Sequence, residues 1–132
     1  MFRTILAFAL TIAFLSSALA DQLSRTVPAN RKSQVYSHAL YQKQTCISGA
    51  IPNMKAGRQP KHGKVTFQRS SFKLSKKAGG CAGKLIKGMG IFYTPDRNFR
   101  GKDTFTVNYS YETYPGSSRR NFVSTTYNIT VK

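Results

Sequence analysis

Few residues of this chain are of the types that perform catalysis. The sequence contains two histidines, His38 and His62, and serines plentiful enough to make a Ser–His–Asp triad formally possible. However, the G-x-S-x-G turn that presents a nucleophilic serine is absent. His62 stands in the lysine-rich turn PKHGK at 60–64, where a solvated side chain is expected, and His38 stands in a strand-like run. We therefore expect no catalytic residues and predict that the protein is not an enzyme.

The acidic residues and cysteines form no pattern typical of a metal site. Calcium needs several oxygen ligands, usually with more than one carboxylate, and only Asp96 and Asp103 are near neighbours in the sequence. We interpret both as turn-forming residues rather than as calcium ligands or a glycosidase acid pair. Cys46, Cys81 and the two histidines match no zinc spacing, and GGCAGKLIKG at 79–88 lacks the phosphate-loop pattern. No metal and no cofactor is expected.

Positive charge is the chemical feature that remains. The 21 Lys and Arg residues outnumber the 4 Asp and Glu residues, which gives a formal net charge of +17. Charge of this size creates a field that attracts polyanions, and the excess of lysine over arginine favours non-specific attraction over bidentate recognition. The predicted anion-binding residues form three groups in the sequence: Lys55, Arg58, Lys61 and Lys64; Lys73, Lys76, Lys77, Lys84 and Lys87; and Arg119 and Arg120.

These groups predict binding to anionic polymers of the cell envelope or its surroundings, such as lipopolysaccharide, an acidic glycan, anionic lipid or extracellular DNA. A generally basic, solvated surface that selects no partner is the alternative for the same residues. Stacking on single-stranded nucleic acid would need exposed aromatic residues among the basic ones, and most aromatic residues here fall on core-facing positions. A second hypothesis is a protein-interaction module, such as an adhesin accessory or an inhibitor, that uses the 112–121 loop or an edge strand.

The first twenty residues have the pattern of a secretory signal peptide. A short basic start is followed by an apolar run over residues 5–15 and by Ala18 and Ala20 in A-x-A relation. The run is too short to span a membrane, although an uncleaved N-terminal anchor is the alternative. We expect cleavage after Ala20 and an exported protein, periplasmic or secreted, with no transmembrane segment in the mature chain. Loss of Arg3 then lowers the formal charge from +17 to +16.

Export determines how the two cysteines are interpreted. In an oxidising compartment, Cys46 and Cys81 are expected to form a structural disulfide rather than a reactive thiol or a metal site. In the chain-entropy model, closing a loop of about 35 residues stabilises the fold by roughly 3–4 kcal/mol.

The hydrophobic periodicity is that of β-strands. Residues 104–111 and 123–131 alternate large and polar side chains, and the turn-rich segment 112–121 between them predicts a hairpin with a long, basic loop. Shorter runs stand around 65–67, 72–74 and 89–93, and 34–48 is ambiguous between strands and a helical turn. Residues 21–33 show no pattern and are predicted to be a flexible arm. About seven short strands predict an antiparallel β-sandwich, with an OB-like barrel as its main competitor.

Three motifs carry a family resemblance: Gly63-x-Val65, Tyr93-Thr94-Pro95 and Asn98-Phe99-x-Gly101-x-Asp103-x-Phe105-x-Val107. They resemble the signature of bacterial Ig-like and cadherin-like repeat domains, over roughly residues 60–132. The resemblance implies an all-β, antiparallel Ig-like β-sandwich for residues 34–132 and says little about activity.

The same motifs indicate structural turn residues. Pro95 is expected to end a strand, Gly101 to adopt a positive φ, and Asp103 to accept backbone N–H bonds at the corner before the next strand. The chain departs from the family as a single basic domain, with too few carboxylates for cadherin-like calcium sites and with a glycine-rich cysteine loop of its own.

Overall fold

The computed structural model describes residues 21–132, so the predicted signal peptide and its cleavage site lie outside the described residues. Within 21–132, no helix is long and apolar enough to cross a bilayer. Seven strands and one short 3-10 helix follow one another along the chain: β1 (Asp21–Val27), β2 (Ser33–His38), β3 (Met54–Ala56), β4 (Gly63–Lys73), η1 (Lys76–Cys81), β5 (Leu85–Pro95), β6 (Gly101–Glu112) and β7 (Arg120–Val131).

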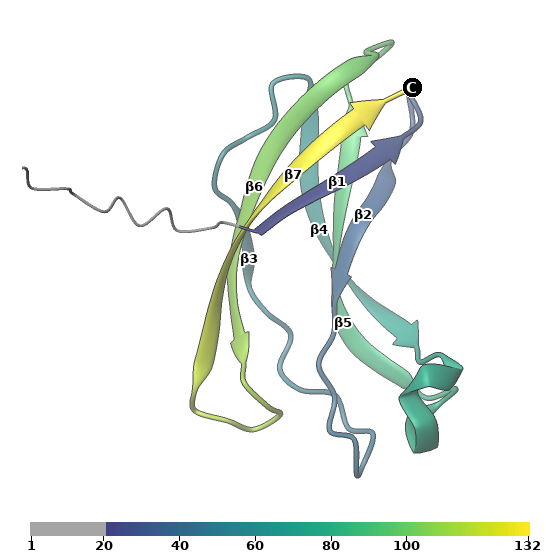
Figure 1. Ribbon diagram of the computed structural model, residues 1–132, viewed down its shortest axis with the longest axis vertical. Coiled ribbons are helices and arrows are strands. Elements are labelled where there is room, and N and C mark those ends of the chain that lie inside the picture. Colours follow the sequence, from purple (N-terminus) through teal and green to yellow (C-terminus); the bar gives the residue numbers. More distant parts are fainter. Residues whose placement is uncertain (1–20) are drawn as a thin grey trace, which may run out of the picture.

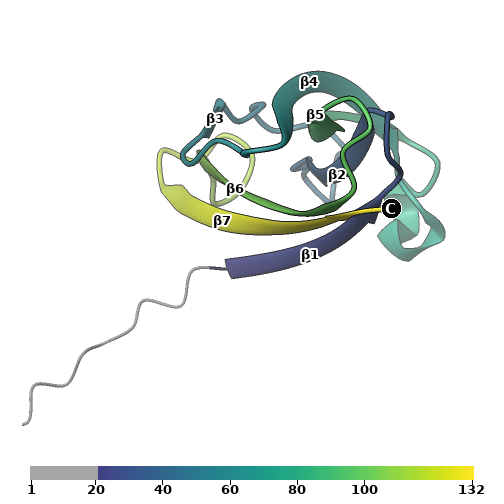
Figure 2. The same ribbon diagram turned by 90° about the horizontal axis from the view of Figure 1, so that it is seen from above.

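The strands form two sheets that face each other (Figures 1 and 2). One sheet has the order β1-β7-β6-β3 and the other the order β2-β5-β4. All neighbouring strands are antiparallel except β1 and β7, which are parallel. In the lettering used for immunoglobulin domains, β1 to β7 become strands A to G. Strands B, E and D (β2, β5 and β4) then lie opposite C, F and G (β3, β6 and β7), as in an immunoglobulin sandwich, with strand A (β1) beside G. The predicted Ig-like β-sandwich of about seven strands is confirmed.

The predicted hairpin is the central element of the four-stranded sheet. Strands β6 and β7 pair from Gly101 opposite Val131 to Glu112 opposite Arg120, so both strands are longer and the loop is shorter than the sequence suggested. Their inward side chains are buried, and the Phe105 ring stacks between those of Tyr127 and Tyr93, with centroids 5.0 and 5.9 Å away. Burial of one face and solvation of the other is what the period-two pattern of a half-buried strand encodes.

The structure corrects the prediction of a flexible arm over residues 21–33. Residues Asp21–Val27 form β1, which pairs in parallel with β7 over its whole length. Leu23 and Val27 face the core, but Arg25 stands between them on the same side and donates from Nε to the Val35 carbonyl, 2.9 Å away. The charged Arg25 on the inward side interrupts the alternation of apolar and polar residues that would predict a strand. The strand forms because it pairs with the open edge of β7.

The two short strands expected around 65–67 and 72–74 are one strand, β4, that runs without a break beside β5. Its first half directs Val65 and Phe67 into the main core. In its second half the partly buried apolar residue is Phe72, on the opposite face of the strand, next to Gly88 of β5. Between Phe67 and Phe72 the apolar residues change from odd to even positions and so to the other face of the strand. In the sequence this change suggests two separate strands, although the backbone of β4 is continuous.

Candidate functional site

One end of the sandwich is built from three connections, which lie together at the lower end of Figure 1. They are residues 39–53 between β2 and β3, residues 74–84 with η1, and residues 113–119 between β6 and β7. We call this end the disulfide pole. The disulfide Cys46–Cys81 joins the first two connections, with the two Cα atoms 5.5 Å apart, and confirms the predicted pairing. It therefore holds together two segments that are 35 residues apart in the sequence.

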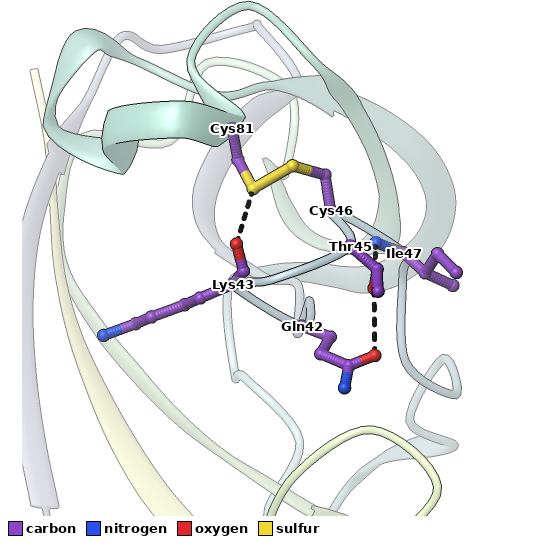
Figure 3. The surroundings of a disulfide bond; sticks show 6 residues. All are labelled: Gln42, Lys43, Thr45, Cys46, Ile47 and Cys81. Carbon is purple, nitrogen blue, oxygen red and sulfur yellow. Dashed lines mark hydrogen bonds between the residues drawn. A yellow bond between two sulfur atoms is a disulfide. The ribbon is translucent and has the colours of Figure 1, made fainter.

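The disulfide is anchored on the side of the first connection (Figure 3). Gln42 N–H donates to the Ile47 carbonyl at 2.9 Å, and Cys46 N–H donates to the Gln42 carbonyl at 2.7 Å, which closes a tight turn. Cys81 is 1% exposed, and its Sγ lies 3.3 Å from the Lys43 carbonyl oxygen. Since a disulfide sulfur carries no proton, this is a close contact rather than a donated bond. The turn therefore fixes where the side chains of Lys43 and Ile47 leave the backbone.

Strands β4 and β5 extend past the end of β2 at this pole. Strand β2 ends at His38, opposite Met89, so residues 85–88 of β5 pair with β4 alone. Leu85 lies on the same side of β5 as the core residues Met89 and Ile91, because side chains alternate along a strand. Yet Leu85 is 69% exposed, at a position beyond the end of β2. We call residues 70–73 and 85–88 the overhang.

A single carboxylate belongs to the disulfide pole, that of Glu112 at the end of β6. Its Oε2 accepts the backbone N–H groups of Ala50 and Gly116, each at 3.2 Å. These bonds tie the connection 39–53 to the loop 113–119. Of the other acidic residues in 21–132, Asp21 begins β1, while Asp96 and Asp103 lie around the β5–β6 turn. The pole is therefore rich in cations and poor in anions.

Of the three predicted groups, the one with five lysines is brought together at this pole. All five of its residues are exposed, on the overhang, on η1 or in the connection beside it: Lys73, Lys76, Lys77, Lys84 and Lys87. The disulfide adds Lys43, whose side chain is exposed and points away from the bridge in Figure 3. Sequence reasoning missed Lys43, although it stands three residues before Cys46 and the predicted disulfide already connected that segment to η1.

Arg119 is the last residue of the loop 113–119 and Arg120 the first of β7, on the β6–β7 side of the same pole. Both are exposed, but the guanidinium of Arg120 is held by Ser110, to whose Oγ and carbonyl oxygen it donates at 3.0 Å each. Arg120 is therefore fixed along the surface of the sheet, whereas the lysines of η1 extend from a short helix.

The remaining predicted group lies elsewhere. Lys64 and Lys73 are at opposite ends of β4, nine residues and thus about 30 Å apart. Arg58 and Lys61 belong to the connection that meets β6 near Thr104 and Asp103, and exposed Lys55 lies on β3. A shallow groove of about 580 Å³ at this far end is lined by Lys61, His62, Lys102, Thr104, Asn128 and Thr130, among others.

The far end also contains a polar cluster around the buried carboxylate of Asp103, which accepts four hydrogen bonds. It accepts backbone N–H bonds from Lys61, His62 and Thr104 at 2.9–3.0 Å and the Tyr93 hydroxyl at 2.8 Å. Burial alone would raise the pKa of Asp103, but the bonds from Tyr93 and the backbone outweigh it and hold the pKa below its usual value. Burial, followed by the bond to Asp103, raises the pKa of Tyr93.

This cluster fastens strands β5 and β6 to the connection before β4. Pro95 is the last residue of β5, and Gly101 opens β6 with φ of 136°, so the turn between them delivers Asp103 to the connection 57–62. Of the four donors to Asp103, Lys61 and His62 belong to that connection, Tyr93 to β5 and Thr104 to β6. The His62 ring stacks on Phe99, with centroids 4.3 Å apart, and is not bonded to the carboxylate.

His38 is the other residue with catalytic potential. Its ring packs on Tyr109 and Tyr111, with centroids 5.4 and 4.5 Å away, beside a shallow hollow of about 380 Å³ that Asp21 also lines. Burial lowers the pKa of His38 and favours the neutral ring. The buried Nε2 has no hydrogen-bond partner among residues 21–132. The described part of the chain also contains no group of three or more His, Cys, Asp or Glu residues able to hold a metal ion.

Comparison with known proteins finds no match: no protein-family model, no curated protein and no solved structure matches this chain.

Proposed function

We propose that this protein is an exported, non-catalytic Ig-like domain that binds anionic polymers of the cell envelope or its surroundings through the disulfide pole. The observation that carries the proposal is the convergence of six exposed lysines on one disulfide-linked end of the molecule. Export remains part of the proposal and rests on the signal-peptide pattern of residues 1–20.

The physical support is the local imbalance of charge. The six lysines share their end of the sandwich with one carboxylate, Glu112, which already accepts two backbone N–H groups. A surface of like charges raises the local concentration of polyanions, and each neutralised phosphate releases a counterion. The lysine ammonium is a flexible point charge, so we expect affinity for phosphate- or carboxylate-bearing polymers in general rather than for one sequence or sugar.

The test compares two variants with the same loss of charge at opposite ends. In the pole variant, Lys76, Lys77 and Lys84 are each replaced by Gln; in the matched control, Lys61, Lys64 and Lys102 are each replaced by Gln. All six side chains are exposed. Binding to lipopolysaccharide, DNA and an acidic glycan is titrated at several salt concentrations.

We expect the pole variant to bind more weakly and its slope of log K against log salt to become shallower by about 2, since each lost phosphate contact is worth roughly 0.7 in that slope. The control should lose only the small long-range contribution of three charges. Equal losses in the two variants would show a generally basic surface without a site, and absence of binding at low salt in the unsubstituted protein would rule out the proposal.

A protein partner is a second candidate, because β4 presents a long unpaired edge. It is an end strand of eleven residues in the order β2-β5-β4, and no strand of the described chain pairs with its outer side. An edge of this length can accept an extended peptide, although Lys64, Arg69 and Lys73 along it disfavour pairing, as charged residues do on natural edge strands. A stoichiometric protein partner captured from an envelope extract and retained at high salt would favour this candidate, or docking on the loop 112–121, over polyanion binding.

A further inference from the structure

Three of the four large apolar side chains that are most exposed in residues 21–132 lie at the disulfide pole. Ile47 is 63% exposed, Leu85 is 69% exposed and Tyr114 is 64% exposed. The fourth, Phe122, lies on the outer surface of β7. Scattered single apolar residues on a surface are ordinary, but a group of them at one rigid end indicates an interaction site.

The backbone holds Ile47 and Leu85 out of the core. Ile47 follows Cys46 directly, and its carbonyl closes the turn with Gln42, so its side chain projects away from the bridge in Figure 3. Leu85 begins the overhang of β5, where the core-facing side of the strand has passed the end of β2. The Ser48 hydroxyl accepts the Lys87 N–H at 2.8 Å and joins the segment of Ile47 to that of Leu85.

Tyr114 lies on the other side of the same connection. Together with Thr113 and Pro115 it lines a shallow hollow of about 350 Å³ whose opposite wall is residues 40–44. The three apolar side chains are therefore carried by two connections of the pole and by the first residue of β5. In the sequence, lysines stand close to two of them: Lys43 to Ile47, and Lys84 and Lys87 to Leu85.

We propose that the disulfide pole docks on the surface of an anionic phospholipid bilayer, with Ile47, Leu85 and Tyr114 inserted at the boundary between headgroups and acyl chains. The inference rests on the proposed polyanion binding and specifies its partner. Lysine ammonium groups satisfy the headgroup phosphates, while aliphatic and tyrosine side chains enter the interfacial layer, which is the arrangement typical of interfacial binding. A soluble polyanion would use the lysines but offers no hydrocarbon to the apolar side chains.

The test uses tryptophan as a reporter, because the chain contains none. Leu85→Trp places the reporter at the pole, and Thr26→Trp places a matched reporter on exposed β1, next to Thr130 at the far end. Each variant, in the form that begins at Asp21, is mixed with phosphatidylglycerol vesicles, with phosphatidylcholine vesicles and with soluble polyphosphate. Emission wavelength and quenching by bromine-labelled acyl chains are recorded.

We expect a blue shift and quenching only for Leu85→Trp and only with phosphatidylglycerol. A second variant, Ile47→Ser with Leu85→Ser, should bind these vesicles about tenfold more weakly, since partial burial of each side chain is lost. Its binding to polyphosphate should be unchanged. Binding to polyphosphate and vesicles without a blue shift or quenching would overturn lipid insertion and leave the proposed function standing. Absence of binding to either would overturn both, and equal quenching of the two reporters would overturn the assignment to this pole.

Discussion

Replacement of Asp103 by Asn tests whether this carboxylate fastens the sandwich. In the folded protein Oδ1 accepts Lys61 N–H and Thr104 N–H, and Oδ2 accepts His62 N–H and the Tyr93 hydroxyl. Asn keeps one oxygen for two of these donors but places an NH₂ group at the other position. The Tyr93 hydroxyl can rotate and accept from it, whereas His62 N–H loses its acceptor.

The expected cost follows from these bonds. One unpaired, partly buried N–H costs about 1–3 kcal/mol, and the remaining bonds change from charge-assisted to neutral. Because water reaches the His62 side, we expect a total loss of about 2–3 kcal/mol in the free energy of unfolding, measured by guanidinium chloride denaturation at neutral pH. For a domain of this size that corresponds to a fall of roughly 10 °C in Tm.

The pH dependence provides a second measurement on the same variant. The pKa of Asp103 is lower in the folded protein than its ordinary value, so its contribution to stability is fully present above about pH 4 and is lost as the pH falls through the folded-state pKa. The unsubstituted protein should therefore lose stability in acid more steeply than Asp103→Asn. The control is Asp96→Asn, an exposed position nearby that should change stability by less than about 0.5 kcal/mol. If Asp103→Asn and Asp96→Asn cost the same, or if the acid limbs of Asp103→Asn and the unsubstituted protein are parallel, the assigned role of Asp103 is wrong.

Two further substitutions test the pole and the sheet beside it. Replacing Cys46 and Cys81 together by Ala removes a cross-link over 35 residues and should lower the free energy of unfolding by about 4 kcal/mol in denaturant titrations; a loss below about 1 kcal/mol would show that the bridge does not constrain the unfolded chain. In Gly88→Ala, the new Cβ would meet the carbonyl oxygen of His38 on the neighbouring strand, which cannot give way easily, so we expect a lower Tm in differential scanning calorimetry. Gly80→Ala, where nothing lies within 4 Å, serves as the control, and equal Tm values for the two would contradict the close approach of β2 and β5.

The elements that could be predicted from the sequence are those whose pattern is decided within the strand. In β6 and β7 every second residue is buried, and the side chains of Phe105, Val107 and Tyr127 belong to one continuous core. The turn before β6 could be predicted equally well, because Pro95 fixes its own φ and lacks an N–H donor, whereas Gly101 permits the positive φ that the turn requires. These features needed no knowledge of distant contacts.

The elements that could not be predicted depend on what lies beside them. Strand β1 exists because β7 offers an open edge about a hundred residues later in the chain, and Arg25 on its inward side obscures the alternation. In β4 the polar residues Arg69 and Ser71 stand on the side of Val65 and Phe67, where the strand reaches and then passes the end of β2. An exposed strand end carries polar residues on both sides, and sequence alone does not show where the opposing sheet stops.

The basic composition of the candidate site could be predicted from the sequence, but its position on the fold could not. Lysines close in sequence can be far apart in space, as Lys64 and Lys73 show at the two ends of one strand. Conversely, Lys43 joins Lys76 and Lys77 through the disulfide, across more than thirty residues. Which cations act together is decided by strand length and by the cross-link, and neither is encoded in the local pattern of charges.

The two ends of the sandwich differ in how their polar groups are used. At the far end, Asp103 and Tyr93 bond to each other and to backbone groups, so a change there acts on the fold. At the disulfide pole, the backbone is held by Glu112 and by the cross-link, while the lysine side chains remain exposed to solvent. Substitutions of those lysines should therefore alter binding without altering the free energy of unfolding. The motif around Asp103 therefore preserves the fold independently of the charged residues at the pole.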